Sequence, residues 1–302
     1  MYPPRVHPTV ASALLTATQF LAEAHAPGGG CGSPTPRSDA EELLSRLLGV
    51  TRLQLRLQGE RVLAAEESSR LESWLQRRAA HEPVQYITGK AAFRDLDLDV
   101  TRDVLIPRPE TEGLVEAVLE ALRLEREAWP APRTLDLGTG SGAIALALAS
   151  EWPAAVVTAS DASRAALALA RANAGALGLD ARIRFLAGDW FAPLGADERF
   201  EVVVSNPPYV APHEWDVLPE DVRAFEPREA LLSGARGLDA IRHVMAGAPA
   251  RLVPGGLLAL ELAEARAHEV LGWFVGADAW ADVALRDDLS GRPRYLLALR
   301  AE

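Results

Sequence analysis

The residues best suited to chemistry are Asn206-Pro207-Pro208-Tyr209, which follow the apolar, β-branched run 200–205. That run predicts a buried strand, so the tetrapeptide should lie where a strand ends and a loop opens, the usual ligand position in an open α/β sheet. The Asn206 side-chain oxygen and the Pro207 carbonyl can each accept one hydrogen of a planar NH2 group. The prolines stiffen the loop, and the Tyr209 ring offers a flat face. The pattern predicts that this loop binds the NH2 group of an amine or amide through both of its hydrogens, an arrangement that we call the grip. A simple proline turn is the alternative.

A glycine-rich turn lies upstream, at Gly138-Thr139-Gly140-Ser141-Gly142, after a predicted short strand. Alternate glycines allow positive φ and let a ligand approach the backbone, and the helix predicted after them offers unpaired N–H groups to an acidic ligand end. The spacing Gly-x-Gly-x-Gly differs from the G-x-G-x-x-G of nicotinamide binders. Such a turn predicts a ligand site only when suitable side chains also lie at the ends of other strands.

Two further predicted strands end in acids. The segment 155–161 ends at Asp161, about twenty residues after the glycines, where a carboxylate can accept both hydroxyls of a ribose. The segment 183–189 ends at Asp189, beside Trp190, whose indole ring can cover an adenine. Four strand ends therefore converge on one crevice, with groups for an amino-acid end, a ribose, an adenine and an NH2 substrate.

These motifs resemble those of the class I S-adenosylmethionine-dependent methyltransferases. The Asn-Pro-Pro-Tyr motif is similar to that of the members which methylate a nitrogen conjugated to a π system. Residues 82–93, 104–112, 222–238 and 286–292 are similar to segments of the release factor glutamine methyltransferases of the HemK type. After Glu261 that family usually continues with a histidine or isoleucine, a glycine and later a glutamine, whereas this chain departs from the pattern.

The resemblance implies an α/β fold of the class I methyltransferase type: a Rossmann-like, doubly wound and mostly parallel seven-stranded sheet, with a small N-terminal helical bundle and a β-hairpin linker. The strands and helices that alternate from Pro107 onward also favour a parallel, doubly wound sheet. We expect residues 1–81 to form a helical substrate-docking domain, 82–105 the hairpin linker, and 106–302 the methyltransferase domain. A purely scaffolding role for the helices is the alternative.

Several local predictions concern the linker and the N-terminal helices. Ser38 or Asp39 is expected to cap the second helix, Thr51 a third, and the segment 62–78 to form a fourth. The alternation over 85–103 predicts the hairpin.

The resemblance implies S-adenosylmethionine as methyl donor and S-adenosylhomocysteine as product, with no metal. Its implied cofactor-binding residues are Gly138, Thr139, Gly140, Ser141 and Gly142 for the methionine end, Asp161 for the ribose, Asp189 and Trp190 for the adenine, and Asn206, which also touches the substrate. The implied catalytic residues are Asn206, Pro207, Pro208 and Tyr209.

Other polar residues near these motifs have open roles. Asp136 is expected to orient the glycine turn or to be structural. Thr111 and Glu112 resemble family positions over the cofactor. Arg108 and Arg228 are candidates for steadying the substrate's loop, with surface salt bridges as the alternative. No catalytic histidine is expected, and His213 should be an exposed loop residue.

The implied activity is methyl transfer to the side-chain amide nitrogen of the glutamine in the Gly-Gly-Gln loop of peptide chain release factors. One alternative is an amino-methyltransferase acting on adenine or cytosine of nucleic acid. Such an enzyme usually needs a basic surface, and this chain has a net charge of −11, so direct nucleic-acid binding is not expected. Another is a non-catalytic cofactor-binding or assembly protein, which would not need the Asn-Pro-Pro-Tyr grip.

Composition gives the remaining expectations. The 302 residues, 49% of them hydrophobic, suffice for two domains with sizeable cores. The single cysteine, Cys31, lies in the glycine- and proline-rich stretch 26–36 and allows no internal disulfide. No signal peptide is evident, and no apolar stretch is long enough for a bilayer. We therefore expect a cytoplasmic protein without a membrane partner.

Overall fold

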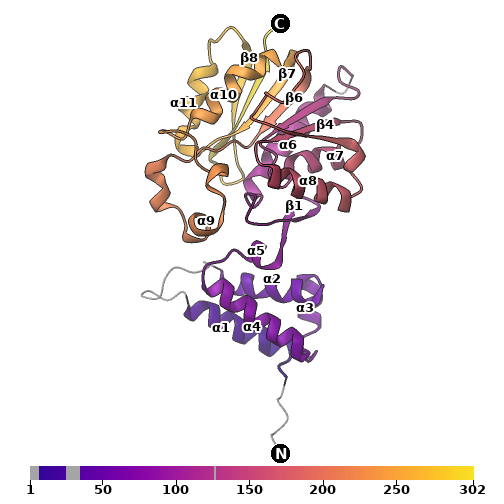
Figure 1. Cartoon of the computed structure of the whole chain (residues 1–302), viewed down its shortest axis with the longest axis vertical. Helices are drawn as coiled ribbons and strands as arrows, with labels where there is room; N and C mark the ends of the chain where they lie inside the picture. Colours follow the sequence, from indigo (N-terminus) through magenta and orange to yellow (C-terminus); the bar gives the residue numbers. More distant parts are fainter. Residues whose placement is uncertain (1–6, 25–34, 126) are drawn as a thin grey trace, which may run out of the picture. The chain divides into compact units, whose positions relative to one another are not determined.

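The computed structural model describes residues 7–24, 35–125 and 127–302 (Figure 1). Cys31 and most of the 26–36 stretch lie outside these ranges. The chain forms two compact units: the first runs to Lys90 and includes Leu218–Phe225, and the second comprises Ala91–Val217 and Glu226–Glu302. No helix in the described ranges is long and apolar enough to cross a membrane.

The first unit is helical and has its own apolar core. The core residues include Leu21, Leu43, Leu55 and Leu71, all buried. Within the first helix the buried residues Val10, Ala13, Ala17 and Leu21 recur every three or four positions, so one face is buried and the other is left to water. The helices are α1 (Val10–Glu23), α2 (Pro36–Leu48), α3 (Arg52–Leu57), α4 (Ala65–Ala79) and α5 (Val84–Thr88), joined by α9 (Glu220–Phe225) from later in the chain.

Two local predictions in this unit are wrong and one is confirmed. Thr51 caps α3, with Gln54 completing a capping box. Neither Ser38 nor Asp39 caps α2, which begins at Pro36; Asp39 instead accepts a hydrogen bond from Arg78 at 2.6 Å. The fourth helix begins at Ala65 and not at residue 62, because Val62 pairs with Thr9 in an antiparallel bridge.

The predicted hairpin is present but shorter than the alternating segment 85–103. It consists of β1 (Lys90–Phe93) and β2 (Leu96–Asp99), while the start of that segment forms the unpredicted helix α5. Arg94, at the turn, donates to Glu151 at 2.7 Å and to Glu116 at 2.7 Å. The hairpin is thereby attached to two helices of the second unit.

The second unit contains the predicted doubly wound sheet of seven strands, in the order β5-β4-β3-β6-β7-β9-β8. The first five strands in this order are parallel, and β9 runs antiparallel to both neighbours. The strands are β3 (Arg133–Leu137), β4 (Val156–Asp161), β5 (Ile183–Ala187), β6 (Phe200–Ser205), β7 (Leu252–Glu261), β8 (Trp280–Asp287) and β9 (Pro293–Arg300).

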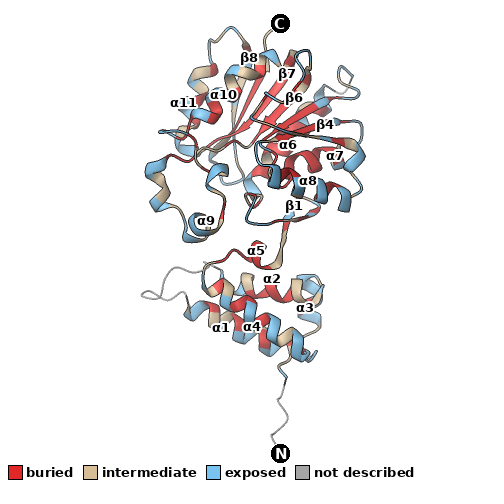
Figure 2. Ribbon diagram, viewed as in Figure 1, coloured by how far each residue is buried: buried red, intermediate tan, exposed pale blue. Residues whose placement is uncertain are grey.

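Helices cover both faces of this sheet, and its central strands are buried (Figure 2). Along β6, Val202 and Val204 face one core and Val203 faces the other, as the two-residue period of a strand requires. The first core also receives α6 (Pro109–Leu124), α7 (Ala143–Glu151) and α8 (Arg164–Ala176); the second receives α10 (Asp239–Gly247) and α11 (Ala267–Phe274).

The strand order reverses between β3 and β6, since β4 and β5 continue to one side of β3 and β7 follows β6 on the other. In open α/β sheets a crevice forms at such a reversal, outside the carboxyl ends of the strands. The fold therefore places the loops after β3 and β6 at the position where a ligand is expected.

Candidate functional site

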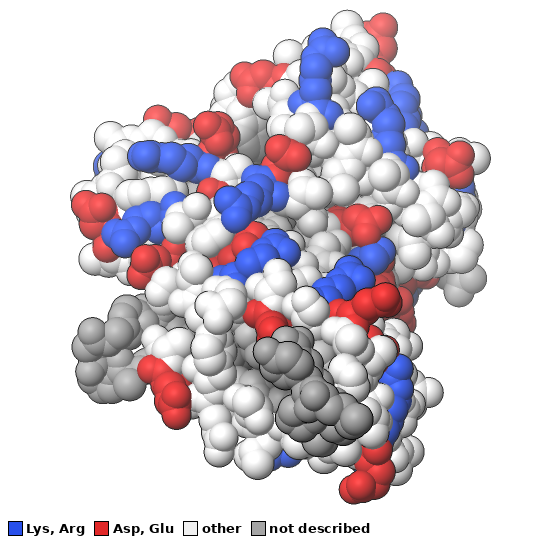
Figure 3. All heavy atoms as spheres, turned by 60° about the horizontal axis from the view of Figure 1, so that its bottom comes forward, with Lys and Arg blue, Asp and Glu red and all other residues white. Residues whose placement is uncertain are grey.

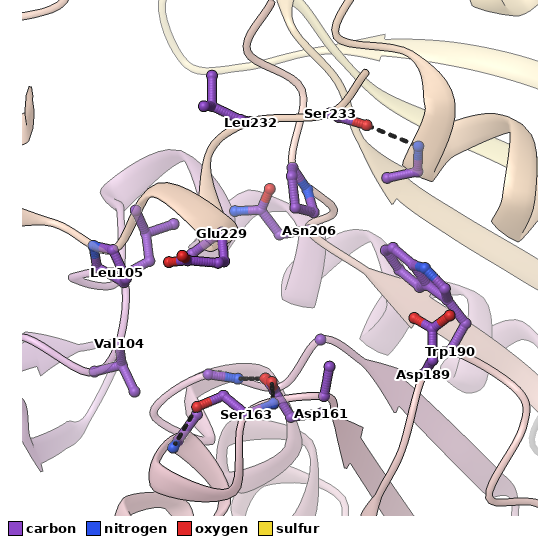
Figure 4. A pocket seen from close by; sticks show the side chains of 18 of the residues that line it. Val104, Leu105, Asp161, Ser163, Asp189, Trp190, Asn206, Glu229, Leu232 and Ser233 are labelled. Carbon is purple, nitrogen blue, oxygen red and sulfur yellow. Dashed lines mark hydrogen bonds between the residues drawn. The ribbon is translucent and has the colours of Figure 1, made fainter. Parts of the chain in front are cut away.

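One cavity of about 630 Å³ lies at the carboxyl ends of β3, β4, β5 and β6 (Figure 4). The four strand ends identified in the sequence thus meet at one place. The predicted residues that line the cavity are Gly138, Gly140, Asp161, Asp189, Trp190, Asn206 and Pro208. The other predicted site residues, Thr139, Ser141, Gly142, Pro207 and Tyr209, are not among its lining residues.

The glycine turn after β3 opens toward this cavity. A side chain on Gly140, whose φ is +56°, would have no protein atom within 4 Å, so the backbone there is open to a ligand. Gly142 serves packing instead, because a Cβ at that position would lie 2.9 Å from Leu146. Thr139 and Ser141 are buried in the turn. They shape the loop and do not face the cavity.

Asp136 holds this turn against the following helix. Its Oδ2 accepts hydrogen bonds from the Thr139 hydroxyl at 2.6 Å and from the Ala145 N–H at 3.2 Å. Burial raises the pKa of the Asp136 carboxyl to about 7, and these two hydrogen bonds oppose the shift. Asp136 is fully buried and does not line the cavity, so its geometry fits the predicted role in orienting the turn.

Asp161, at the end of β4, joins the glycine turn to the start of α8. Its two carboxylate oxygens accept from the Gly140 N–H at 2.9 Å and from the Ser163 N–H at 2.8 Å (Figure 4). Burial raises the pKa of this carboxyl, and the same two hydrogen bonds lower it. A carboxylate can accept about four hydrogen bonds, so Asp161 keeps acceptor capacity on its cavity side.

Asp189 and Trp190 lie side by side at the cavity wall (Figure 4). Trp190 has a φ of +45°, and its ring centroid lies 5.8 Å from that of His243 on α10. The Ser233 hydroxyl accepts from the Ala240 N–H at 2.8 Å near the beginning of α10. The wall beside the indole is therefore built by a loop and a helix far from β5 in sequence.

The Asn-Pro-Pro-Tyr loop follows β6, and Asn206 reaches the cavity. Asn206 Nδ2 donates to Thr111 Oγ1 at 3.1 Å, and that hydroxyl donates to Glu261 Oε2 at 2.7 Å. Burial, and then the negative Glu261, raise the pKa of Tyr209 to about 12. The phenol therefore keeps its proton near neutrality and is not a base there.

The backbone after this loop is fixed by contacts with residues 231–237. Val210 N–H donates to the Leu231 carbonyl at 2.8 Å, and Ser233 N–H donates to the Val210 carbonyl at 3.0 Å. The Arg266 guanidinium donates to the Tyr209 carbonyl at 3.4 Å. The second half of the tetrapeptide is therefore held from two sides.

The segment 104–112 is attached to the segment that follows the tetrapeptide. Glu226, whose side chain is 1% exposed, accepts from Arg108 at 2.6 Å and from the Ile106 N–H at 3.3 Å. Arg228 lies over the Trp215 ring, 4.4 Å from its centroid. Arg108 therefore forms a salt bridge, which was the alternative to a role in steadying the substrate's loop, and its partner is a buried acid. Glu112 accepts from the Arg94 N–H at 2.9 Å and does not line the cavity.

Several residues of the site were missed. Glu261 ends β7 and joins the hydrogen-bonded row with Asn206; the strand-end rule that found the other acids would have found it. Glu229 and His243 also line the cavity (Figure 4 labels Glu229). No pattern in the sequence points to these two, because their place depends on how the chain returns after β6. His213 is exposed, as expected.

Comparison with known proteins assigns this site to a family. Residues 12–89 match the model of the PrmC N-terminal domain, and residues 115–221 match that of the methyltransferase small domain. A release factor glutamine methyltransferase of Cereibacter sphaeroides is 43% identical over 260 residues, covering 86% of this chain and 90% of that protein. The chain belongs to the release factor glutamine methyltransferase family. Relatives of the same name from Burkholderia pseudomallei (46% over 266 residues, 87% and 91% covered) and Moorella thermoacetica (43% over 288 residues, 95% and 100% covered) agree.

The protein is thus a methyltransferase, and the predicted class I methyltransferase fold is confirmed. All four strand-end motifs, from the glycine turn to the tetrapeptide, fall inside the stretch 115–221 that matches the methyltransferase model. The relatives extend over almost the whole chain, so the departure after Glu261 is a local variation and not a change of family.

Proposed function

We propose that this methyltransferase transfers a methyl group from S-adenosylmethionine to the side-chain amide nitrogen of the glutamine in the Gly-Gly-Gln loop of peptide chain release factors. The relatives described above, all of them release factor glutamine methyltransferases by name, support this substrate. The observation that carries the proposal is the position of Asn206 at the cavity, at the beginning of the Asn-Pro-Pro-Tyr loop. Because release factors work in the cytoplasm, we place the enzyme there.

The cavity fits S-adenosylmethionine in size and in donor set. Its volume of about 630 Å³ lies within the roughly 300–1,000 Å³ of small-molecule sites. The glycine turn would hold the methionine end, Asp161 the ribose hydroxyls, and Asp189 with Trp190 the adenine. When bound, the cofactor supplies a methyl group already activated on a sulfonium. The difficulty that the protein must overcome is the weak nucleophilicity of the acceptor.

An amide nitrogen is a poor nucleophile because its lone pair is delocalised into the carbonyl, as the roughly 18–20 kcal/mol rotation barrier of a peptide bond reflects. Asn206 Oδ1 and the Pro207 carbonyl would each accept one hydrogen of the glutamine NH2 group. The two contacts would orient the nitrogen toward the methyl group and stabilise the positive charge that develops on it. The methylated nitrogen then loses one proton to solvent, so no strong general base is required.

The tyrosine and the prolines would complete this acceptor site. With its pKa at about 12, Tyr209 stays neutral and supplies an apolar face for the planar amide. Pro207 and Pro208 restrict the loop that carries the second acceptor. Prior ordering of these groups matters because well-oriented reactants can gain as much as roughly 7–11 kcal/mol over free ones.

The second candidate, methylation of adenine or cytosine in nucleic acid, would use the same grip on an exocyclic amino group. It would also need cationic surface for the phosphates. On the face shown in Figure 3, arginine side chains are interspersed with acidic ones and form no continuous basic patch. With a net charge of −11, this surface favours a protein substrate.

The decisive experiment incubates the enzyme with methyl-labelled S-adenosylmethionine and purified release factor, and locates the label by mass spectrometry. Label on the glutamine of the Gly-Gly-Gln loop is the expected result. A release factor with that glutamine replaced by asparagine is the matched control and should stay unlabelled. Label found instead in added RNA or DNA would support the second candidate, and no label in either would contradict both.

A further inference from the structure

Three side chains form a hydrogen-bonded row next to the cavity. Asn206 Nδ2 donates to Thr111 Oγ1 at 3.1 Å, and Thr111 Oγ1 donates to Glu261 Oε2 at 2.7 Å. The three come from different elements: the loop after β6, the first turn of α6 and the end of β7. Thr111 is 4% exposed and Glu261 1% exposed, so water does not compete for the bond between these two residues.

The chemistry of the row fixes the direction of each bond. An ionised carboxylate only accepts, and a hydroxyl has a single proton, so Thr111 must give its proton to Glu261. The Thr111 oxygen is then available only as an acceptor, and the group that donates to it must be the Asn206 NH2. In the described part of the chain no hydrogen bond engages Asn206 Oδ1, which lies on the opposite arm of the planar amide.

We infer that Thr111 and Glu261 are positioning residues, which hold the Asn206 amide in the one orientation that presents its oxygen to the NH2 group of the substrate. The inference rests on the proposed role of Asn206. If the amide turned over, Nδ2 would face the substrate, and two donors would meet where an acceptor is needed. The row thus makes the grip specific for an incoming NH2 group without touching the substrate.

The ionised state of Glu261 is what gives the row its direction. Once Glu261 is protonated, its O–H can donate to Thr111, and the Thr111 O–H can then donate to Asn206 Oδ1. Both orientations of the Asn206 amide then become available, and its oxygen is no longer held toward the substrate. Burial raises the pKa of Glu261 to about 7, while the hydrogen bond from Thr111 opposes this shift. The orientation should therefore weaken as the pH falls below neutrality.

Other charged groups around Glu261 shift the pH at which its carboxylate is protonated. The positive Arg294 and Arg108 lower its pKa and the negative Glu110 raises it. The two phenols that sense its charge, Tyr209 and Tyr295, both have their pKa values raised to about 12, so they do not titrate near neutrality.

A matched pair of substitutions tests the row. Thr111→Val keeps the shape of the side chain but removes the hydroxyl, and Thr111→Ser keeps the hydroxyl. Turnover of release factor by Thr111→Val should fall roughly 10–100-fold, by analogy with the loss of a residue that orients a metal ligand through a hydrogen bond. Its KM for release factor and its affinity for S-adenosylmethionine should stay within roughly threefold of wild type, and Thr111→Ser should retain wild-type turnover. A cooperative melt confirms that each variant is folded.

The orientation can also be measured without any activity, from the side-chain amide signal of Asn206 in ¹⁵N NMR spectra, assigned by its loss in Asn206→Asp. From about pH 5 to about pH 8 this signal should shift in the wild type and in Thr111→Ser, following Glu261, and stay still in Thr111→Val. An amide that titrates alike in all three proteins, or a serine variant as inactive as the valine variant, would overturn the inference. If wild type fails to methylate release factor, the proposed function falls, and the amide signal still decides whether the row orients Asn206.

Discussion

Replacing Gly237 by alanine tests whether the position of the Asn-Pro-Pro-Tyr loop sets the rate. Gly237 has a φ of +69°, and a Cβ there would lie 2.3 Å from the Tyr209 carbonyl oxygen and 3.0 Å from the Ala211 nitrogen. Both are backbone atoms, which cannot rotate aside as a side chain can. The loop would have to recede by roughly 1 Å to reach an ordinary contact, and a misplacement of that size can cost about 10²-fold in rate.

We therefore expect Gly237→Ala to lower kcat for release factor about 10²-fold. Its affinity for S-adenosylmethionine should change little, because the glycine turn and Asp161 lie on other strands. Initial rates of methyl transfer give the first quantity and calorimetry the second. The substitution also carries a backbone cost of roughly 1–2 kcal/mol, since alanine is strained at positive φ. That cost alone would lower stability but not kcat in the folded fraction.

Gly276→Ala separates the two effects. Gly276 has a φ of +80°, but a Cβ there meets no atom within 4 Å, and the residue lies in the loop between α11 and β8. This variant should lose similar stability and keep wild-type kcat. Equal kcat in both variants would refute the idea that the Gly237 contact positions the grip. Equal loss of cofactor affinity and kcat in Gly237→Ala would indicate a general collapse of the site instead.

Three further predictions concern single side chains. Asn206→Ala removes one of two acceptors and should lower kcat by roughly 10²–10³, and turnover within about threefold of wild type in rate assays would contradict the grip. Asp161→Ala should weaken S-adenosylmethionine binding by about 1.5–3 kcal/mol in calorimetry, because a charge-assisted hydrogen bond is lost. Glu261→Gln should reduce the pH dependence of stability: with its pKa raised from 4.5 to about 7, Glu261 binds a proton more tightly in the folded state, so stability falls as pH rises between these values. Glu261 contributes at most roughly 1.4 kcal/mol per pH unit to the change of the free energy of unfolding with pH, which denaturant unfolding at several pH values can measure. The same slope in Glu261→Gln and in wild type would show that Glu261 is not the titrating group.

The sheet and the groups at its strand ends could be predicted because both depend on local sequence. A buried parallel strand is a short apolar run, and the residue after it must lie at the carboxyl edge of the sheet. This rule alone brought Gly140, Asp161, Asp189 and Asn206 to one cavity. Applied to β7, the same rule would have added Glu261.

The parts that were missed depend on contacts between residues far apart in sequence. Asp39 lies inside α2, which begins at Pro36, and its carboxylate bonds to Arg78, thirty-nine residues later. Glu229 and His243 reach the cavity through the return of the chain along Val210 and Leu232, a bridge that no local pattern announces. Local preference is overridden where a long-range partner supplies more free energy than a cap of about 1 kcal/mol.

The final prediction concerns the first unit, which we propose docks the release factor. Its helices enclose their own core, and every residue that lines the cavity lies between Asp103 and His243 in the second unit. A fragment that begins at Gly89 lacks α1 to α5 but keeps the hairpin and the whole cavity. It should bind S-adenosylmethionine with nearly the affinity of the full chain, as calorimetry would measure.

The same fragment should methylate whole release factor poorly, because binding energy from parts of the substrate remote from the amide helps to position it. A short peptide that contains the Gly-Gly-Gln sequence is the matched control, since it is too small to use the helices, and both proteins should methylate it at similar rates. Residues Leu218–Phe225 lose their packing partners in the fragment, so a cooperative melt must show that it is folded. If the folded fragment methylates whole release factor as fast as the full chain, the helices contribute nothing to docking, and their role is to support the fold.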